Sequence, residues 1–139
     1  MKVKRLSPSA KLPTKAHAGD LGYDLYASQP TTIWPGETTL IETDIAIQFP
    51  PGLGGIIKDR SSIATKRHLF TVSGVIDSGY IGAIKVAIHN ASEHIQAVAV
   101  GDKIAQMILT SVINSDPVEV DELISLDNRG VGGFGSTGS

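Results

Sequence analysis

Residues 45–52 read Ile-Ala-Ile-Gln-Phe-Pro-Pro-Gly, a run in which large apolar side chains alternate with small or polar ones before a turn. Because successive side chains of an extended chain point to opposite faces, this period of two predicts a half-buried β-strand. Pro51 and Gly52 predict the turn, since proline removes a backbone donor and glycine accepts a left-handed backbone.

The alternation recurs further along the chain. Residues 84–88 alternate in the same way as residues 45–49. A weaker alternation predicts Ile95, Ala97 and Ala99 as the apolar side of another strand.

Residues 104–112 are almost entirely apolar, which is typical of a strand buried on both faces. The chain contains 15 glycines and 7 prolines, and these residues divide the apolar runs at short intervals. Turns are expected at residues 34–37, 50–52, 77–79 and 101–102. Short strands with frequent turns predict an all-β sandwich or barrel.

Only residues 61–67 predict a helix. Ser61 and Ser62 are residues that cap helix starts, and Lys66 and Arg67 place positive charge where the helix dipole favours it. The helix would have two turns at most.

The composition excludes several classes of protein. A chain of 139 residues fits one domain, and without cysteine it can form neither a disulfide framework nor a thiolate zinc site. The net charge of -2 argues against a nucleic-acid partner. No apolar run is long enough to cross a membrane, so no membrane partner is expected. Cytoplasm is the default compartment, with nucleus and virion as alternatives.

The end of the chain differs from the rest. Residues 128–139 contain five glycines but only one valine and one phenylalanine. This composition is typical of a disordered tail, because ordering glycine costs much conformational entropy. The alternative is an arm that becomes ordered when a ligand contacts Arg129 and Phe134.

Four short clusters could support chemistry, although each has a simpler interpretation. Residues 22–25 also look like a strand start, and residues 101–106 look like an ordinary turn. Arg60, Ser61 and Ser62 could bind phosphate at the start of the helix, or the serines could merely cap it. In residues 74–80, Asp77 follows a strand and precedes Tyr80, which is also what an ordinary turn looks like.

Taken together and in order, these clusters resemble the five motifs of the trimeric dUTPase family. The resemblance covers nearly the whole chain, and its third and fifth motifs are the specific ones. The matching segments are Gly22–Tyr26, Arg60–Ser62, Gly74–Gly82, Gly101–Gln106 and Arg129–Gly138.

The resemblance implies a β jelly roll, or distorted barrel, over residues 1–127 and a C-terminal arm over residues 128–139 that closes on the active site. It implies a homotrimer with shared active sites, and hydrolysis of dUTP to dUMP and pyrophosphate. Asp77 would activate the attacking water, and Tyr80 would exclude a ribose. Mg²⁺ is the expected cofactor, held by Asp24 through water.

A hairpin from Thr71 to Ile76 would read uracil through main-chain groups. Lys85 matches a position where the family often has a substrate contact, and a solvated strand position is the equal alternative. The residues that match substrate-binding positions are Arg60, Ser61, Ser62, Thr71, Gly74, Val75, Ile76, Asp77, Tyr80, Lys85, Gln106, Arg129, Phe134, Gly135, Ser136 and Thr137.

Three residues depart from the family pattern. Asp59 stands where Gly or Pro is more common, and this acid could weaken phosphate binding or point away. Leu21 replaces a usual Ala, and His68 replaces a frequent Gly.

Two other functions were weighed against hydrolysis. A dCTP deaminase has a similar fold, but it needs a glutamate where this chain has Ala87. A non-catalytic relative with a regulatory or binding role should have lost Asp77, Tyr80 or the tail motif, and all three are present.

Overall fold

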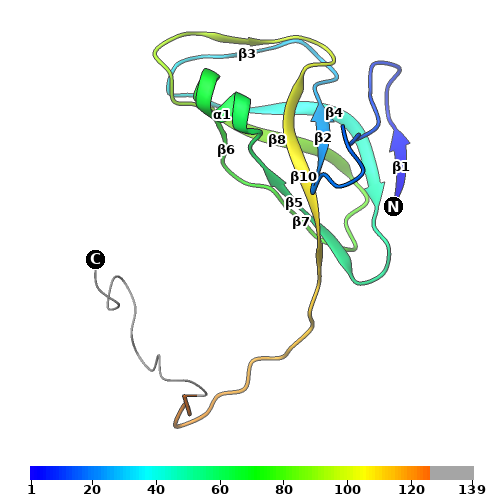
Figure 1. Ribbon diagram of the computed structural model, residues 1–139, viewed down its shortest axis with the longest axis vertical. Coiled ribbons are helices and arrows are strands. Elements are labelled where there is room, and N and C mark those ends of the chain that lie inside the picture. Colours follow the sequence, from blue (N-terminus) through cyan, green and yellow to red (C-terminus); the bar gives the residue numbers. More distant parts are fainter. Residues whose placement is uncertain (126–139) are drawn as a thin grey trace.

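Two four-stranded sheets form the body of the molecule (Figure 1). The structure is a computed structural model, and it describes residues 1–125. In the first sheet the order is β1 (Lys2–Arg5), β4 (Thr38–Gln48), β8 (Ala83–Asn90) and β6 (Leu69–Thr71). In the second it is β2 (Gly22–Tyr26), β10 (Lys103–Ser111), β5 (Leu53–Lys58) and β7 (Val75–Ile76). A separate pair joins β3 (Thr31–Ile33) to β9 (Gln96–Val98), and all of these pairings are antiparallel.

One apolar core lies between the two large sheets. In β8 the side chains of Ile84, Val86 and Ile88 are buried while Lys85 is exposed. The C-terminal half of β4 alternates in the same way, with Ile45 and Ile47 buried. Each large apolar side chain buried in this way contributes about 1.5–3 kcal/mol. Because side chains of both sheets belong to this single core, the predicted all-β jelly roll is confirmed.

The predicted apolar side of residues 95–99 is wrong. Val98 is buried, whereas Ile95, Ala97 and Ala99 are exposed. Both faces of this strand carry apolar side chains, so the sequence gives little preference. Its single neighbour, β3, fixes which face meets the core.

Only the first half of β10 is buried on both faces as predicted. Ile104, Ala105 and Met107 are buried, but Ile108 and Leu109 are half-buried. Over its second half β10 pairs with Gly54 and Gly55 of β5, which have no side chains to cover their neighbours, and β2 pairs no further than Ile108.

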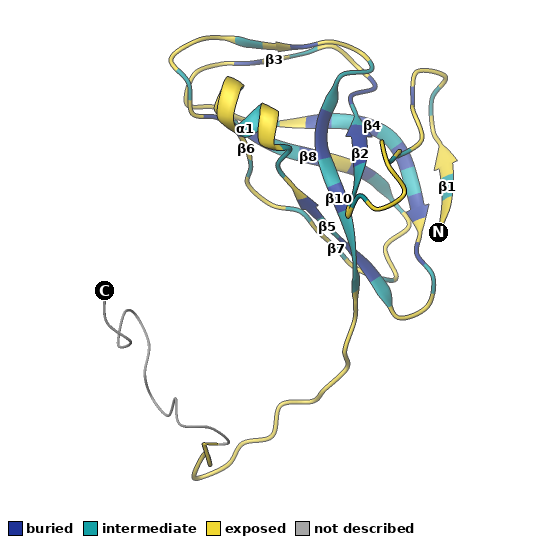
Figure 2. Cartoon of the chain, viewed as in Figure 1, coloured by how far each residue is buried: buried dark blue, intermediate teal, exposed yellow. Residues whose placement is uncertain are grey.

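The helix α1 (Ser61–Arg67) has the predicted bounds, but serine does not cap it. Its N-cap is Arg60, which makes no side-chain capping hydrogen bond. Lys66 and Arg67 occupy the last turn as predicted, and the helix ends at His68 in a left-handed conformation. No helix residue is fully buried, and Figure 2 shows α1 exposed on the surface of the sheets.

The predicted hairpin from Thr71 to Ile76 is wrong in its pairing. β6 pairs with β8 in one sheet, and β7 pairs with β5 in the other. The segment between them therefore crosses from sheet to sheet. Gly74 is required there: its φ is 144°, and an added Cβ would lie 2.7 Å from the Cβ of Ile57.

After β10 the chain leaves the body of the fold. Residues 112–125 are exposed and run away from the sheets (Figure 1). The expected arm, with Arg129, Phe134, Gly135, Ser136 and Thr137, lies outside the described residues. Within residues 1–125, no helix is long and apolar enough to span a membrane.

Candidate functional site

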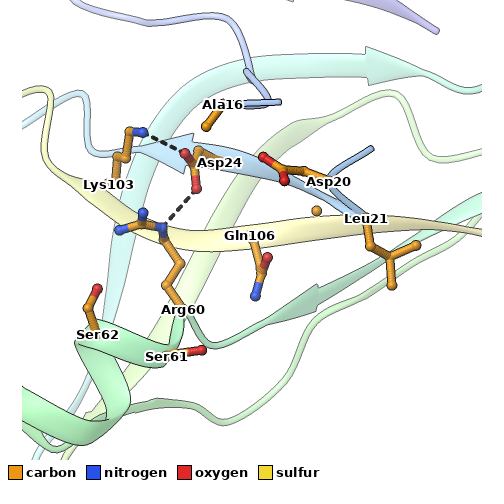
Figure 3. A pocket seen from close by; sticks show the side chains of 10 residues that line it. Ala16, Asp20, Leu21, Asp24, Arg60, Ser61, Ser62, Lys103 and Gln106 are labelled. Carbon is orange, nitrogen blue, oxygen red and sulfur yellow. Dashed lines mark hydrogen bonds and ion pairs between the residues drawn. The ribbon is translucent and has the colours of Figure 1, made fainter. Parts of the chain in front are cut away.

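A buried acid between two cations lies at the centre of the candidate site (Figure 3). Asp24 Oδ1 accepts a hydrogen bond from Arg60 Nε at 2.8 Å, and Asp24 Oδ2 lies 2.7 Å from Lys103 Nζ. Asp24 is only 9% exposed, and these two partners offset the cost of burying its charge. The hydrogen bond and the attraction of Asp24 raise the pKa of Lys103 above its usual value.

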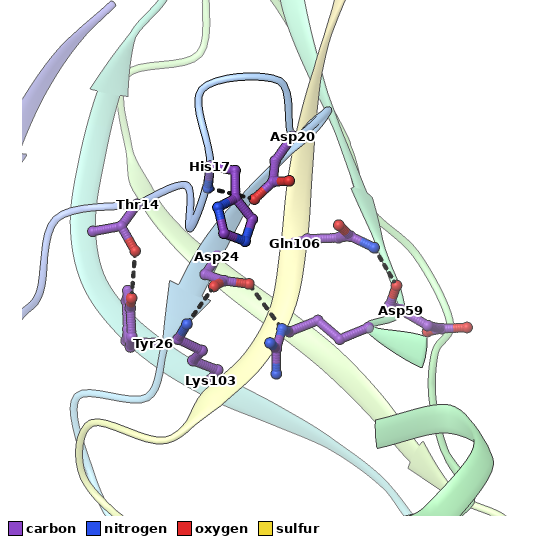
Figure 4. Close-up of polar contacts among 9 residues, drawn as sticks. Thr14, His17, Asp20, Asp24, Tyr26, Asp59, Lys103 and Gln106 are labelled. Atoms are coloured by element: carbon purple, nitrogen blue, oxygen red, sulfur yellow. Dashed lines mark hydrogen bonds and ion pairs between the residues drawn. The ribbon is translucent and has the colours of Figure 1, made fainter. Parts of the chain in front are cut away.

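Strand register brings these residues together. β10 lies between β2 and β5, and its Gln106 pairs with Asp24 on one side and with Lys58 on the other. Gly22 leaves room for the Gln106 side chain, because an added Cβ would collide with Gln106 Oε1. Gln106 Nε2 then donates to the main-chain oxygen of Asp59 at 2.8 Å (Figure 4).

These side chains line a hollow of about 460 Å³. Its lining includes Arg60, Ser61, Ser62, Lys103 and Gln106. Two cations, two hydroxyls and an amide form a set of donors suited to phosphate oxygens. We call this hollow the phosphate cradle. Sequence reasoning missed Lys103, because side chains three residues apart on a regular strand point to opposite faces; a register shift between Lys103 and Ala105 lets Lys103 and Gln106 line the same hollow.

The residues of the cradle are compatible with a metal ion that is bound mainly by the phosphate oxygens of a ligand. Among residues 1–125, no group of three or more His, Cys, Asp or Glu side chains could enclose a metal ion. Both oxygens of Asp24 already contact cations. A contact from Asp24 to a hydrated ion through water is compatible with this arrangement, because each carboxylate oxygen has a second lone pair.

A second hollow, of about 260 Å³, contains Asp77. Tyr80 also lines it; its main-chain N–H donates to Asp77 O at 3.1 Å, and its Oη donates to Ala83 O at 3.0 Å. Among the described residues, the exposed Asp77 carboxylate has no hydrogen-bond or ion-pair partner. An unpaired carboxylate in a hollow is available to accept a proton.

Lys85 is exposed on β8, as the solvated alternative predicts, and its substrate contact stays a prediction. Lys85 lines the Asp77 hollow, but its Nζ lies 2.7 Å from Glu42 Oε1 on the neighbouring strand. This contact raises the pKa of Lys85, chiefly through the hydrogen bond.

A third hollow, of about 300 Å³, lies next to the second and shares Val75 with it. Thr71, Ser73 and Gly74 also line it, together with the end of β5. The main-chain N–H of Thr71 donates to the carboxylate of Asp59. Asp59 therefore binds β6, and of its two expected behaviours the structure favours pointing away from the phosphate cradle.

The described chain brings the predicted residues together in two groups rather than one. Ile76 pairs with Gly55, which puts Asp77 beside the start of β5, whereas Arg60 follows the end of β5. An extended chain advances about 3.3 Å per residue, so the six residue-to-residue steps from Gly54 to Arg60 separate the two groups by about 20 Å. Asp77 and the phosphate cradle of the same chain thus face different parts of its surface.

Comparisons with known proteins agree on one family. The family model described as dUTPase matches residues 8–138. Deoxyuridine 5'-triphosphate nucleotidohydrolase from Candida albicans is 44% identical over 140 residues, which are 99% of this chain and 87% of the relative. These matches favour the hydrolase over the deaminase.

Solved structures give the same result. A variant of the Staphylococcus bacteriophage 80alpha dUTPase, solved with dUpNHpp, has a TM-score of 0.91 at 29% identity and covers 99% of this chain and 98% of its own. A dUTPase variant from phage phi11 of S. aureus, described with a structural Mg(II) ion, has a TM-score of 0.84 at 27% identity, with 89% and 98% covered.

Proposed function

The chain belongs to the dUTPase family and hydrolyses dUTP to dUMP and pyrophosphate, and we propose that Asp77 is its general base. The observation that supports this role is the Asp77 carboxylate, which has no partner among residues 1–125 and lies in a hollow that it shares with Tyr80. In this mechanism Asp77 takes a proton from water as the water attacks the α-phosphorus, and pyrophosphate leaves on the opposite side.

Tyr80 and the segment from Thr71 to Ile76 are the proposed selectivity filters. The ring of Tyr80 would lie against the deoxyribose and leave no room for a 2′-hydroxyl. Main-chain groups around Gly74 and Val75 would bind the edge of uracil, and the third hollow is the space for the base.

The phosphate cradle and the tail would hold the triphosphate. Arg60, Ser61, Ser62 and Gln106 bind phosphate oxygens in this proposal, and Lys85 would exchange Glu42 for a phosphate contact. The tail residues, all outside the described part of the chain, would close over the substrate: Arg129, Phe134, Gly135, Ser136 and Thr137. Asp24 would hold a phosphate-bound Mg²⁺ through water, and the ion would neutralise charge on the triphosphate.

We also propose a homotrimer with shared active sites, and the separation of the two groups supports the sharing. A water activated by Asp77 must lie within a few ångströms of the α-phosphate, yet the cradle of the same chain is about 20 Å away along β5. A second copy would have to supply the cradle. Residues 112–125 support this assembly, because they expose apolar side chains that a neighbouring copy could cover.

The proposal keeps the division of the chain into residues 1–127 and an arm of residues 128–139 that acts on a neighbouring site. The cytoplasmic compartment also stays a prediction.

Pyrophosphate release with Mg²⁺ tests the proposal, with dUTP, dTTP, dCTP and UTP at equal concentration. We expect release from dUTP alone. Asp77→Asn should bind dUTP but lose about 10²–10⁴-fold in kcat, the usual contribution of a general base. Glu93→Gln removes an exposed carboxylate elsewhere and should leave kcat unchanged. Near-normal turnover by Asp77→Asn would contradict the assignment.

A further inference from the structure

Asp59 lies between the phosphate cradle and the third hollow and binds one residue of each. Its main-chain oxygen accepts from Gln106 Nε2 at 2.8 Å, and its carboxylate accepts from the main-chain N–H of Thr71. Gln106 lines the cradle, and Thr71 lines the third hollow. Figure 4 shows the Asp59 side chain pointing away from Asp24 and Lys103.

The Asp59 carboxylate accepts a hydrogen bond from the Thr71 N–H, a donor for which the sheet offers no acceptor. Within residues 1–125, β6 is an edge strand that pairs with β8 alone. Val72 N–H donates to Ala87 O in β8, so strand alternation turns the Thr71 N–H outward, to the open side of β6. Asp59 is the acceptor on that side.

We propose that Asp59 is a positioning residue for uracil selection: it fixes the end of β6 from which the base-reading segment begins. This inference rests on the proposed function of that segment. The three residues after Thr71 cross to the second sheet, where Gly74 packs tightly against Ile57. A shift at Thr71 therefore changes the third hollow, because the other end of the crossing cannot move to compensate.

An acid next to the cradle can affect substrate binding in two ways. A free carboxylate there would repel a triphosphate and raise KM. A carboxylate that accepts a hydrogen bond from an N–H donor repels the triphosphate less, and it also fixes the position of the donor. The two roles predict opposite results when the charge is removed.

Asp59→Asn and Asp59→Ala separate the two roles. Asparagine keeps an oxygen that can accept from Thr71 N–H and removes the charge, whereas alanine removes both. The measurements are kcat and KM for dUTP and the ratio of kcat/KM between dUTP and dTTP. We expect Asp59→Ala to lower kcat/KM for dUTP about tenfold, mostly through KM, and to narrow the dUTP/dTTP ratio. Asp59→Asn should keep both kcat/KM for dUTP and the dUTP/dTTP ratio close to the wild-type values.

Glu37→Ala is the matched control. Glu37 Oε2 accepts from the main-chain N–H of Trp34 at 3.3 Å in an exposed turn, so this variant loses the same kind of bond outside the five motifs and outside the lining of the three hollows. It should leave the dUTP/dTTP ratio unchanged. Melting temperatures of all variants show that they are folded.

A lower KM in both Asp59 variants would mean that the acid repels substrate, and an unchanged ratio in Asp59→Ala would mean that Thr71 needs no anchor. Either result overturns the inference and leaves the proposed function intact. A wild-type enzyme that hydrolyses dTTP as well as dUTP would instead contradict the proposed base-reading segment itself.

Discussion

At the scale of single residues, the phosphate cradle depends on one shared carboxylate. Asp24 pairs with Arg60 and Lys103, which come from the start of a helix and from another strand. Each cation is held by a partner before any substrate arrives, so little side-chain entropy is lost when phosphate binds. Removing Asp24 would leave two cations near each other without their common counter-charge.

Gly82 controls the orientation of Tyr80. A Cβ at Gly82 would lie 2.5 Å from Tyr80 Oη and 2.6 Å from Cζ, although the Gly82 backbone itself is not in the left-handed region. Gly82→Ala should displace the ring and reduce the preference for dUTP over UTP about tenfold, which corresponds to about 1.4 kcal/mol of discrimination. Steady-state kinetics with both nucleotides measures this ratio.

The control for Gly82→Ala is Gly79→Ala in the same turn, where an added Cβ meets nothing within 4 Å. It should keep the wild-type ratio. If both alanine variants discriminate against UTP equally well, the ring does not depend on Gly82.

At the scale of elements, the helix α1 ends with an unfavourable residue. His68 has φ 52° and ψ 38°, a conformation that glycine adopts without steric cost. His68→Gly should therefore stabilise the protein by about 0.5–1 kcal/mol, because relief of a left-handed backbone cost of about 1–2 kcal/mol exceeds the entropy of about 0.5–1 kcal/mol that glycine adds to the unfolded chain. Lys66→Gly, inside the helix, should instead destabilise it by about 1 kcal/mol. Thermal unfolding at one fixed protein concentration shows whether each variant is more or less stable than the wild type. A lower melting temperature for His68→Gly would contradict the predicted stabilisation.

A buried asparagine joins three elements. Asn90 Nδ2 donates to Ile33 O at 3.0 Å and to His94 O at 2.8 Å, and its Oδ1 accepts from Ser92. The side chain is fully buried, so Asn90→Ala should cost about 2–4 kcal/mol by leaving carbonyl groups without donors. Asn90→Asp keeps the shape and removes the donor, so it should be at least as destabilising in the same unfolding experiment. A stable aspartate variant would show that the donor is unimportant.

At the scale of the whole molecule, the exposed segment after β10 is the feature that a single chain leaves unexplained. Its apolar side chains are largely exposed, among them Ile113 at 86% and Leu123 at 87%. Covering such side chains is favourable at about 25 cal/mol per Å². The segment therefore favours association, while residues 128–139 are proposed to act on substrate.

Two truncations separate assembly from catalysis. Deleting residues 128–139 should keep the trimer and strongly lower activity, because only the arm is lost. Deleting residues 112–139 should also abolish the trimer, because the apolar segment is lost with it. Light scattering after size-exclusion chromatography measures the mass, and pyrophosphate release measures activity. A trimer that survives the longer deletion would place the interface on the sheets instead.

Elements with a strong local pattern could be predicted from the sequence. Residues 45–49 and 84–88 alternate strongly enough to fix their buried faces, and residues 61–67 form the expected helix. The motifs also identified the family, because they depend on residue type and order rather than on pairing.

Contacts between distant groups could not be predicted from local patterns and are visible only in the folded chain. The fold joined Asp24 to Lys103, tied Asp59 to Thr71, and separated Asp77 from the cradle along β5. Where alternation was weak, as around Val98, a neighbouring strand chose the face. The physical reason is that side-chain direction follows from the local backbone, whereas partners depend on strand register, which long-range packing sets.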